Sequence, residues 1–424
     1  MLLFTKKYLF ALTGVFLLYF LLCYGSSTLH FSIESGKPIH PTTNWIFNRS
    51  DTTYNITDNY DLNGRRVVIP NGVTLRFNGG RLSNGTLIGD RTKLFVKSCA
   101  FDNVKIEGTW DCADISSAMF ANNGKENVLR EVLALANENV KNKIVIEPGE
   151  YILSVTEAEK VCLMIPSNTE FVNNGNISLK PNDLKSYALI RLRDVNNVTI
   201  TGSGKIKGDR ENHLGNKGEW GMGIKVSGSN NVKIIGCDIS NVWGDCIYIG
   251  GRPSNVSVTK CNLSTGLRQG ITITSAKKVL VDSCTIKNIG GKRPGYAIDL
   301  EPNKYNRIEE VIVRNCIVDG CDGGFKVCEY KEGAHIGNVE FENCILNVRK
   351  HKSFSIVGGD LVRITRCSVE NEGFYNESVF RNTRNLVVSD VNVIDNNLKP
   401  YVLKRCENNS FHRFVHRNRK DKIQ

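Results

Sequence analysis

The sequence has little proline, methionine or aromatic character: its 424 residues include 10 Pro, 4 Met and only 8% Phe, Trp and Tyr. Its 14 Cys are too few for a scaffold held together by disulfides. With 41% hydrophobic and 23% charged residues, the composition excludes disorder, collagen and a protein with several membrane spans. No phosphate-binding loop, dinucleotide fingerprint or Ser/His/Asp triad signature stands out. Glycine is abundant, with 38 residues, and indicates a β-rich chain with many tight turns.

The formal net charge is +12, but much of the excess lies at the two ends of the chain. Lys6 and Lys7 stand at one end, and residues 404–424 are basic at the other. The part between them is only mildly basic, so we expect no nucleic-acid partner. Residues 396–424 are predicted to form a solvated basic tail.

Residues 8–24 form an uncharged apolar run directly after the two lysines. A positive region followed by an apolar stretch is typical of export, so residues 1–24 are predicted to be a signal peptide or N-terminal membrane anchor. The run is at the lower limit of a membrane span, which leaves membrane attachment open. We therefore expect an exported protein that is extracellular, periplasmic or at the cell surface.

One short phrase recurs along the second half of the chain: a polar residue, V-x-[IVF], two residues, often Cys, one residue and then an aliphatic residue. Copies begin at Asn197, Asn231, Asn255, Lys278, Glu310, Asn338, Asp360 and Asn385. The copies alternate apolar and polar residues, which indicates short strands with one buried face. A single copy cannot bury that face alone, so the copies must stack. The pattern predicts an all-β solenoid, a right-handed parallel β-helix.

Six cysteines occupy one position of this repeat. They are Cys237, Cys261, Cys284, Cys316, Cys344 and Cys367. Disulfides, metal ligands and buried hydrophobic side chains are all open interpretations of such a column. No cysteine or histidine cluster has zinc spacing, and stacked equivalent positions point the same way, so we favour a buried column of thiols.

The segment before the repeat is less regular. Residues 25–125 are predicted to be an irregular β region, and residues 126–395 the β-helix itself. Apolar residues within 126–140 share one helical face, which predicts a helix that caps the open end of the β-helix at its N-terminal side. This helix is followed by KIVIEPGEYIL, which predicts strand, turn and strand.

The order of that helix, IVIEPGEYIL and NVTITGSGKIKGD resembles the pectate-lyase-like superfamily, which includes the polygalacturonases. The resemblance covers roughly residues 115–395 and implies a right-handed parallel β-helix that acts on polysaccharide. WGDCIYI resembles a polygalacturonase motif, but Gly244 replaces the first Asp of its pair and only Asp245 is retained. Gln269 stands where that family has a His, and its R-x-K motif is absent. If the site is catalytic, the acid must come from Asp299 or Glu301.

Polar residues interrupt the strand that follows each repeat phrase. Aligning the apolar residues of these strands predicts a first outward column of Tyr248, Thr272, Asp299 and Lys326. A second column contains Gly250, Thr274, Glu301 and Cys328. Four further residues flank the columns at the preceding turns: Asp245, Arg268, Gln269 and Tyr296.

These columns suggest a site for an acidic, uronate-containing polysaccharide. Asp299 and Glu301 are two residues apart on one strand, which suits an acid and a base, and Asp245 enters from two rungs earlier. Arg268, Gln269 and Lys326 are predicted to bind the substrate, the cations through a uronate carboxylate. Two tyrosines, Tyr248 and Tyr296, are predicted to pack against sugar rings.

Several alternatives remain open at this point. The reaction is hydrolysis or β-elimination, with epimerisation also possible, and no cofactor or metal is expected. An elimination or epimerisation site could hold Ca²⁺ on Asp245, Asp299 and Glu301. The purely structural interpretation is a surface salt-bridge ladder in which Asp299 neutralises Lys326. The non-enzyme alternative is a glycan-binding or cell-surface structural β-helix, for which we expect a flat face instead of a groove.

Overall fold

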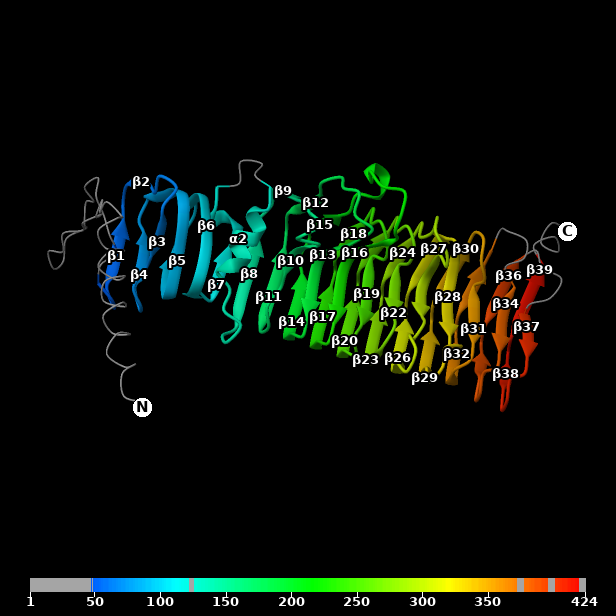
Figure 1. The fold of residues 1–424 in the computed structure, drawn as a ribbon. Coiled ribbons are helices and arrows are strands. Elements are labelled where there is room, and N and C mark those ends of the chain that lie inside the picture. The colour runs from blue at the N-terminus through cyan, green and yellow to red at the C-terminus, as the bar shows by residue number, and fades with distance from the viewer. Residues whose placement is uncertain (1–46, 48, 122–125, 372–376, 396–400, 419–424) are drawn as a thin grey trace, which may run out of the picture. The chain divides into compact units, whose positions relative to one another are not determined.

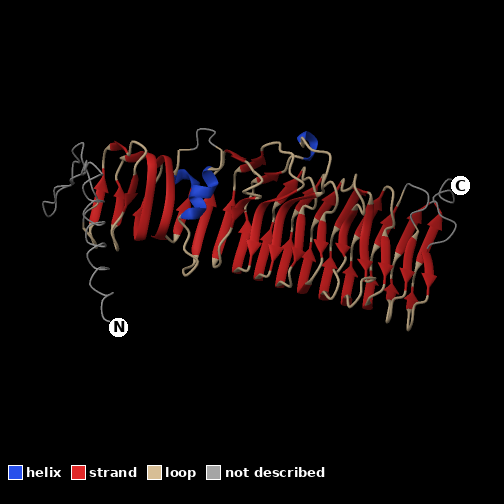
Figure 2. Cartoon of the chain, viewed as in Figure 1, coloured by secondary structure: helices blue, strands red, loops and turns tan. Residues whose placement is uncertain are grey.

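The computed structural model describes residues 47, 49–121, 126–371, 377–395 and 401–418. The chain divides into two compact units: unit 1 comprises residues 1–96 with 102–108, and unit 2 comprises residues 97–101 with 109–424. Strands account for nearly all of the regular structure in the described residues (Figure 2). The predicted export segment, residues 1–24, lies outside the described residues. Within the described part of the chain, no helix is long and apolar enough to cross a membrane.

Unit 1 is built from parallel strands. Its first four strands have three or four residues each and pair with strands about 19–22 residues further along the chain. Tyr54, Ile56, Leu75 and Leu82 point inward and are fully buried, so they form its core. The strands of this sheet are β1 (Thr53–Ile56), β2 (Asn59–Asp61), β3 (Arg66–Val68), β4 (Thr74–Phe77), β5 (Arg81–Phe95) and β6 (Phe101–Asp111), of which residues 102–108 belong to unit 1.

The described residues of unit 2 form three long parallel sheets, which Figure 1 shows as successive rungs along the chain. The ten-stranded sheet contains β10 (Val161–Met164), β13 (Ser186–Arg193), β16 (Trp220–Ser227), β19 (Ile247–Gly250), β22 (Ile271–Ile273), β25 (Tyr296–Leu300), β28 (Gly323–Cys328), β31 (Phe354–Val357), β34 (Ser378–Arg381) and β37 (Tyr401–Lys404). The twelve-stranded sheet contains β7 (Asp114–Ser116), β8 (Asn142–Ile146), β11 (Thr169–Asn173), β14 (Asn196–Thr201), β17 (Asn230–Ile235), β20 (Ser254–Thr259), β23 (Ala276–Asp282), β26 (Arg307–Arg314), β29 (His335–Glu342), β32 (Asp360–Thr365), β35 (Val387–Ser389) and β38 (Ser410–His412). The eleven-stranded sheet contains β9 (Glu150–Leu153), β12 (Asn176–Leu179), β15 (Lys205–Lys207), β18 (Asp238–Ser240), β21 (Asn262–Ser264), β24 (Thr285–Lys287), β27 (Ile317–Cys321), β30 (Ile345–Val348), β33 (Ser368–Glu370), β36 (Asn392–Asp395) and β39 (Val415–Asn418).

The core of unit 2 lies between these sheets, where equivalent residues of successive rungs stack. Ile247, Ile271, Ile298 and Phe325 are register partners on neighbouring strands and are all fully buried. Such stacking buries apolar faces that no rung could bury alone. The prediction of an all-β chain of stacked parallel strands is therefore confirmed.

Asparagine explains how the turns of unit 2 repeat. Asn197, Asn231 and Asn255 open three copies of the repeat with φ of 58°, 53° and 54°, a left-handed conformation that asparagine tolerates better than most residues. Their side-chain amides also stack, because Asn231 Nδ2 donates to Asn197 Oδ1 at 2.8 Å and Asn255 Nδ2 donates to Asn231 Oδ1 at 3.3 Å. Asparagine thus suits this turn position for two reasons: it adopts the left-handed backbone conformation, and its side chain forms hydrogen bonds with the asparagines of neighbouring rungs.

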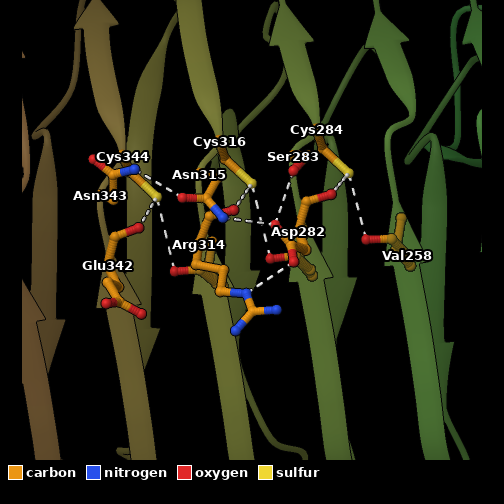
Figure 3. Close-up of polar contacts among 12 residues, drawn as sticks. Val258, Asp282, Ser283, Cys284, Arg314, Asn315, Cys316, Glu342, Asn343 and Cys344 are labelled. Carbon is orange, nitrogen blue, oxygen red and sulfur yellow. Dashed lines mark hydrogen bonds and ion pairs between the residues drawn. The ribbon is translucent and has the colours of Figure 1, made fainter.

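The cysteine column is buried and unpaired, as the sequence predicts. Each of the six thiols is at most 4% exposed, and the cysteines of the described residues are all free. Figure 3 shows how three of them stack: Cys284 Sγ donates to the carbonyl oxygen of Val258, one rung earlier, at 3.4 Å. Cys316 and Cys344 repeat this contact with the preceding rung at 3.9 and 3.8 Å. The position therefore suits a small, largely apolar side chain such as cysteine, and valine takes it at Val391.

The elements at the two ends of the predicted β-helix differ from the prediction. Within residues 126–140, the helix α2 spans only Val128–Ala134, and its capping role stays a prediction. Two short 3₁₀ helices, η1 (Ser117–Met119) and η2 (Arg210–Asn212), complete the helical elements of the described chain. Residues 401–418 were predicted to lie in a basic tail, but β37, β38 and β39 add a further strand to each sheet.

Candidate functional site

Four adjacent strands of the ten-stranded sheet bring the first outward column together. Tyr248 on β19, Thr272 on β22, Asp299 on β25 and Lys326 on β28 are successive register partners, as predicted. Thr272 and Asp299, however, are only 3% and 1% exposed, whereas the sequence predicted that both face solvent. Neighbouring side chains cover them, and Gln269 from the turn before β22 is in direct contact with Asp299. The column is thus correct in register but sheltered in its middle.

A groove of about 260 Å³ lies beside this column. Five of the eight predicted site residues line it, namely Tyr248, Arg268, Gln269, Asp299 and Glu301. A concave surface is the feature that separates a functional cleft from a flat structural face in our sequence hypothesis. The geometry therefore favours a cleft that binds or transforms a ligand.

Asp299 is the most strongly perturbed carboxyl group in the groove. Gln269 Nε2 donates to its Oδ2 at 2.5 Å, and Lys326 Nζ lies 3.4 Å from the same oxygen. The other oxygen, Oδ1, is buried without a hydrogen-bond partner. Burial raises the pKa of Asp299 to about 7, and the neighbouring carboxylates add to this rise while the Lys326 ammonium opposes it. A carboxyl group of this kind holds its proton close to neutral pH.

Glu301, two residues after Asp299 and directly after the end of β25, is held in the opposite state. Lys326 Nζ donates to Glu301 Oε2 at 2.7 Å, and the Tyr330 hydroxyl donates to Oε1 at 3.0 Å. Lys331 Nζ lies 3.4 Å from Oε1. Although burial works to raise its pKa, these hydrogen bonds and cations hold the pKa of Glu301 below its ordinary value. Between these two pKa values, Asp299 is therefore protonated while Glu301 is ionised.

Asp245 and Arg268 form an ion pair with each other. Arg268 Nε and Nη2 donate to the two oxygens of Asp245 at 2.8 and 2.7 Å, and the Asp245 side chain is fully buried. Arg268 also approaches Glu219 at 3.7 Å. Arg268 lines the groove, whereas Asp245 lies beneath it. A bidentate pair of this kind fixes the guanidinium as a part of the groove wall.

The remaining predicted residues serve the site in different ways. The Tyr248 hydroxyl lies 2.9 Å from Thr274 Oγ1, and its ring faces Lys225 Nζ at 5.2 Å. Gln269 accepts from the backbone N–H of Tyr296 at 2.8 Å, which fixes the amide that donates to Asp299. Tyr296 is buried and its ring stacks on His351, so it supports the site from behind.

Sequence reasoning missed several residues of the groove. Lys225 and Trp220 on β16 line it, as does Lys331 after β28, and Tyr330 holds Glu301. The Trp220 side chain is 45% exposed, which is unusual for tryptophan and leaves a flat apolar face open to a ligand. Extending the column alignment backwards by one strand would have found Lys225, because it is the register partner of Tyr248.

A metal site does not emerge from the described residues: they contain no group of three or more His, Cys, Asp or Glu side chains placed to hold an ion. The Lys326 ammonium lies between Asp299 and Glu301, close to both. The Ca²⁺ alternative stays a prediction that no contact in the structure supports.

Comparisons with known proteins agree with the fold. Residues 170–338 match the family model described as "Right handed beta helix region". The chain covers 91% of the exopolygalacturonase from Thermotoga maritima with 72% of its own length, at 13% identity and a TM-score of 0.50. At that identity the likeness shows the fold alone. The chain thus has the right-handed parallel β-helix fold of the superfamily that its sequence resembles.

Two curated relatives from Bacillus subtilis (strain 168) match over shorter stretches. The SPbeta prophage-derived uncharacterized protein YorA is 31% identical over 221 residues, which are 44% of this chain and 38% of YorA. The uncharacterized protein YclG is 29% identical over 160 residues, 33% of this chain and 27% of YclG. The chain therefore spans well under half the length of each relative.

Proposed function

We propose that the groove of unit 2 hydrolyses an acidic, uronate-containing polysaccharide, with Asp299 as general acid and Glu301 as general base. The observation that carries this proposal is that the pKa values of two neighbouring carboxyl groups, Asp299 and Glu301, are shifted in opposite directions. Asp299 is buried with a pKa of about 7, and Glu301 is kept ionised by Lys326, Tyr330 and Lys331. Environments that push two neighbouring pKa values apart are a hallmark of acid–base pairs.

The roles follow from these states. Asp299, protonated near neutral pH, donates its proton to the glycosidic oxygen as the bond to the sugar breaks. Glu301, ionised, removes a proton from the water that attacks the opposite face of the ring. Their carboxyl groups approach each other across the Lys326 ammonium, whose Nζ lies 3.4 Å from Asp299 Oδ2 and 2.7 Å from Glu301 Oε2.

The surrounding residues suit a carbohydrate ligand. Arg268 and Lys331 line the groove and present donors for a uronate carboxylate. Trp220 and Tyr248 offer rings against which a sugar can pack. Export, which residues 1–24 predict, would bring such an enzyme into contact with polysaccharides outside the cytoplasm.

The test is an assay of polygalacturonate, alginate and hyaluronan with the wild-type chain, Asp299→Asn and the control Asp319→Asn. Asp319 is a partly exposed carboxylate on β27 of the eleven-stranded sheet, 3.8 Å from Lys287, and lies outside the groove. We expect new reducing ends without the absorbance of an unsaturated uronate, and a loss of about 10²–10⁴-fold in Asp299→Asn only. Absorbance of an unsaturated uronate would instead establish β-elimination. A change of sugar configuration without cleavage would establish epimerisation, and tight binding without either reaction would establish the glycan-binding alternative.

A further inference from the structure

The first outward column continues beyond Tyr248 towards the N-terminal strands. Lys225 on β16 is the register partner of Tyr248, and Arg191 on β13 is the register partner of Lys225. With strands about 4.8 Å apart, Lys225 lies roughly 14 Å from Asp299 along the column and Arg191 roughly 19 Å from it. Lys225 lines the groove, and Arg191 lines a neighbouring hollow of about 630 Å³. The groove at Asp299 and Glu301 and the hollow at Arg191 thus both lie along this column of strands.

Arg191 and Lys225 form no close ion pair. Among the residues that the structure describes, no carboxylate lies within ion-pair distance of either side chain, and Asp194 and Asp245 act on Arg191 and Lys225, respectively, from further away. Arg191 Nε is buried without a hydrogen-bond partner. Burial lowers the pKa of Lys225, and the positive charges of Arg191 and Arg193 lower it further. Like charges directly opposite on neighbouring strands destabilise a sheet, so this arrangement has a cost in the unliganded protein.

The cations at the other end of the groove are all neutralised. Arg268 pairs with Asp245, Lys326 with Asp299 and Glu301, and Lys331 with Glu301. Unpaired charge is therefore a local property of β13 and β16. An anion bound there would supply the missing partner and the missing acceptor for Arg191 Nε. Trp220, five residues before Lys225 on β16, also lines the groove, and its exposed ring offers a surface on which a sugar of the same polysaccharide can pack.

We propose that Arg191 and Lys225 form a subsite for an anionic group, a carboxylate or a sulfate, on a sugar residue three to four strands away from the Asp299–Glu301 pair. The subsite fixes the position of the polysaccharide chain along the column and so decides which glycosidic bond meets Asp299. This inference rests on the proposed function for its account of the reacting bond, but the binding of an anionic saccharide at Arg191 and Lys225 can be measured independently.

The experiment measures binding to three polymers in the Asp299→Asn background, in which cleavage is expected to be about 10²–10⁴-fold slower. Polygalacturonate presents carboxylates, dextran sulfate presents sulfates, and dextran is neutral. The test variant is Arg191→Gln with Lys225→Met. The matched control is Arg363→Gln with Lys233→Met, two cations on β32 and β17 of the twelve-stranded sheet, which removes the same charges away from the groove. Thermal unfolding of every variant checks that it is folded.

We expect the test pair to lower the affinity for at least one anionic polymer about tenfold or more, with the control pair and dextran unaffected. The polymer whose affinity falls identifies carboxylate or sulfate as the preferred group. An equal loss in the control pair, or no loss for either anionic polymer, would overturn the subsite. In the catalytically intact chain the test pair should raise KM for the cleaved polymer and leave kcat close to its wild-type value. Cleavage with an unchanged KM would overturn the subsite and leave the proposed function standing, whereas loss of binding in a chain that cleaves nothing would do the reverse.

Discussion

The two ends of the groove use positive charge in opposite ways. On β28 and at the turn before β22, the cations form ion pairs with the protein's own carboxylates: Lys326 with Asp299 and Glu301, and Arg268 with Asp245. On β13 and β16 the cations Arg191 and Lys225 lie next to each other without a close ion pair, and Asp194 and Asp245 act on them from further away. Paired charges fix protonation states and geometry, which a reacting centre needs. Unpaired charges keep their attraction for a ligand, which a recognition site needs.

The largest effect is expected at the paired end, from loss of the base. Glu301→Gln should lower the rate of hydrolysis about 10²–10⁴-fold, because no group would then remove the proton of the attacking water. Azide, which needs no deprotonation, should restore cleavage in Glu301→Gln and yield a glycosyl azide. It should not restore cleavage in Asp299→Asn, which lacks the acid instead. Rescue of both variants, or of neither, would contradict the assigned roles.

The buried pair beneath the groove should dominate stability. Asp245→Asn leaves the Arg268 guanidinium largely buried without a carboxylate, and breaking such a pair costs about 3–5 kcal/mol. Urea unfolding of this variant measures the change in the free energy of unfolding. Arg191→Gln is the matched comparison at the unpaired end and should change it by less than about 0.5 kcal/mol. Equal losses in the two variants would remove the distinction between the two ends.

The dependence of activity on pH should follow the pKa values of Asp299 and Glu301. Because the pKa of Asp299 is raised to about 7, activity should fall as the pH rises through about 7 and the acid loses its proton. Because the pKa of Glu301 is lowered, the acidic limb should lie below the range of an ordinary glutamate. Lys326→Met removes a cation that lowers the pKa of Asp299, so the alkaline limb should move to higher pH. A profile that stays flat through pH 7 in the wild-type chain would contradict Asp299 as the acid.

The same shift has a consequence for stability. The folded chain holds the proton of Asp299 more tightly than the unfolded chain, whose carboxyl group has a pKa near 3.8. Its contribution is therefore fully present below about pH 4 and is lost as the pH rises to about 7. Asp299→Asn should flatten this part of the curve of unfolding free energy against pH, while Asp319→Asn should leave it in place.

The smallest effect is expected at the unpaired end. Lys225→Met relieves repulsion from Arg191, so the free energy of unfolding should rise by a few tenths of a kcal/mol. Thermal or urea unfolding in low salt measures this, and added salt should reduce the difference because it screens the repulsion. A loss of stability would instead indicate that Lys225 supports the fold.

Much of the fold could be predicted because the repeat acts at short range. The alternation of apolar residues and the fixed place of cysteines such as Cys284 specify strands, their inward faces and their stacking. The final rung was missed because its basic residues looked like a tail. Its signal was nevertheless present: Asn408, with a φ of 51°, donates to Asn385 as the earlier turn asparagines do.

The site could be predicted only where it depends on register. The column through Tyr248, Thr272, Asp299 and Lys326 follows from aligning strands, so the sequence sufficed. The burial of Asp299 does not follow, because Gln269 reaches it from a turn whose path no alternation pattern specifies. The pairing of Asp245 with Arg268 is also a contact between neighbouring rungs at their turns. Such contacts depend on loop geometry, which the apolar pattern leaves undetermined.

Because the strands stack in register, the residues of the outward column are evenly spaced along the β-helix. Every rung adds one outward position, and its neighbours lie one strand spacing to either side. Gain or loss of a whole rung between β16 and β25 would move Lys225 and Arg191 by one such step relative to Asp299, with both ends otherwise intact. Duplication of a rung is therefore a single genetic event that can change where along a polysaccharide the chain is cut.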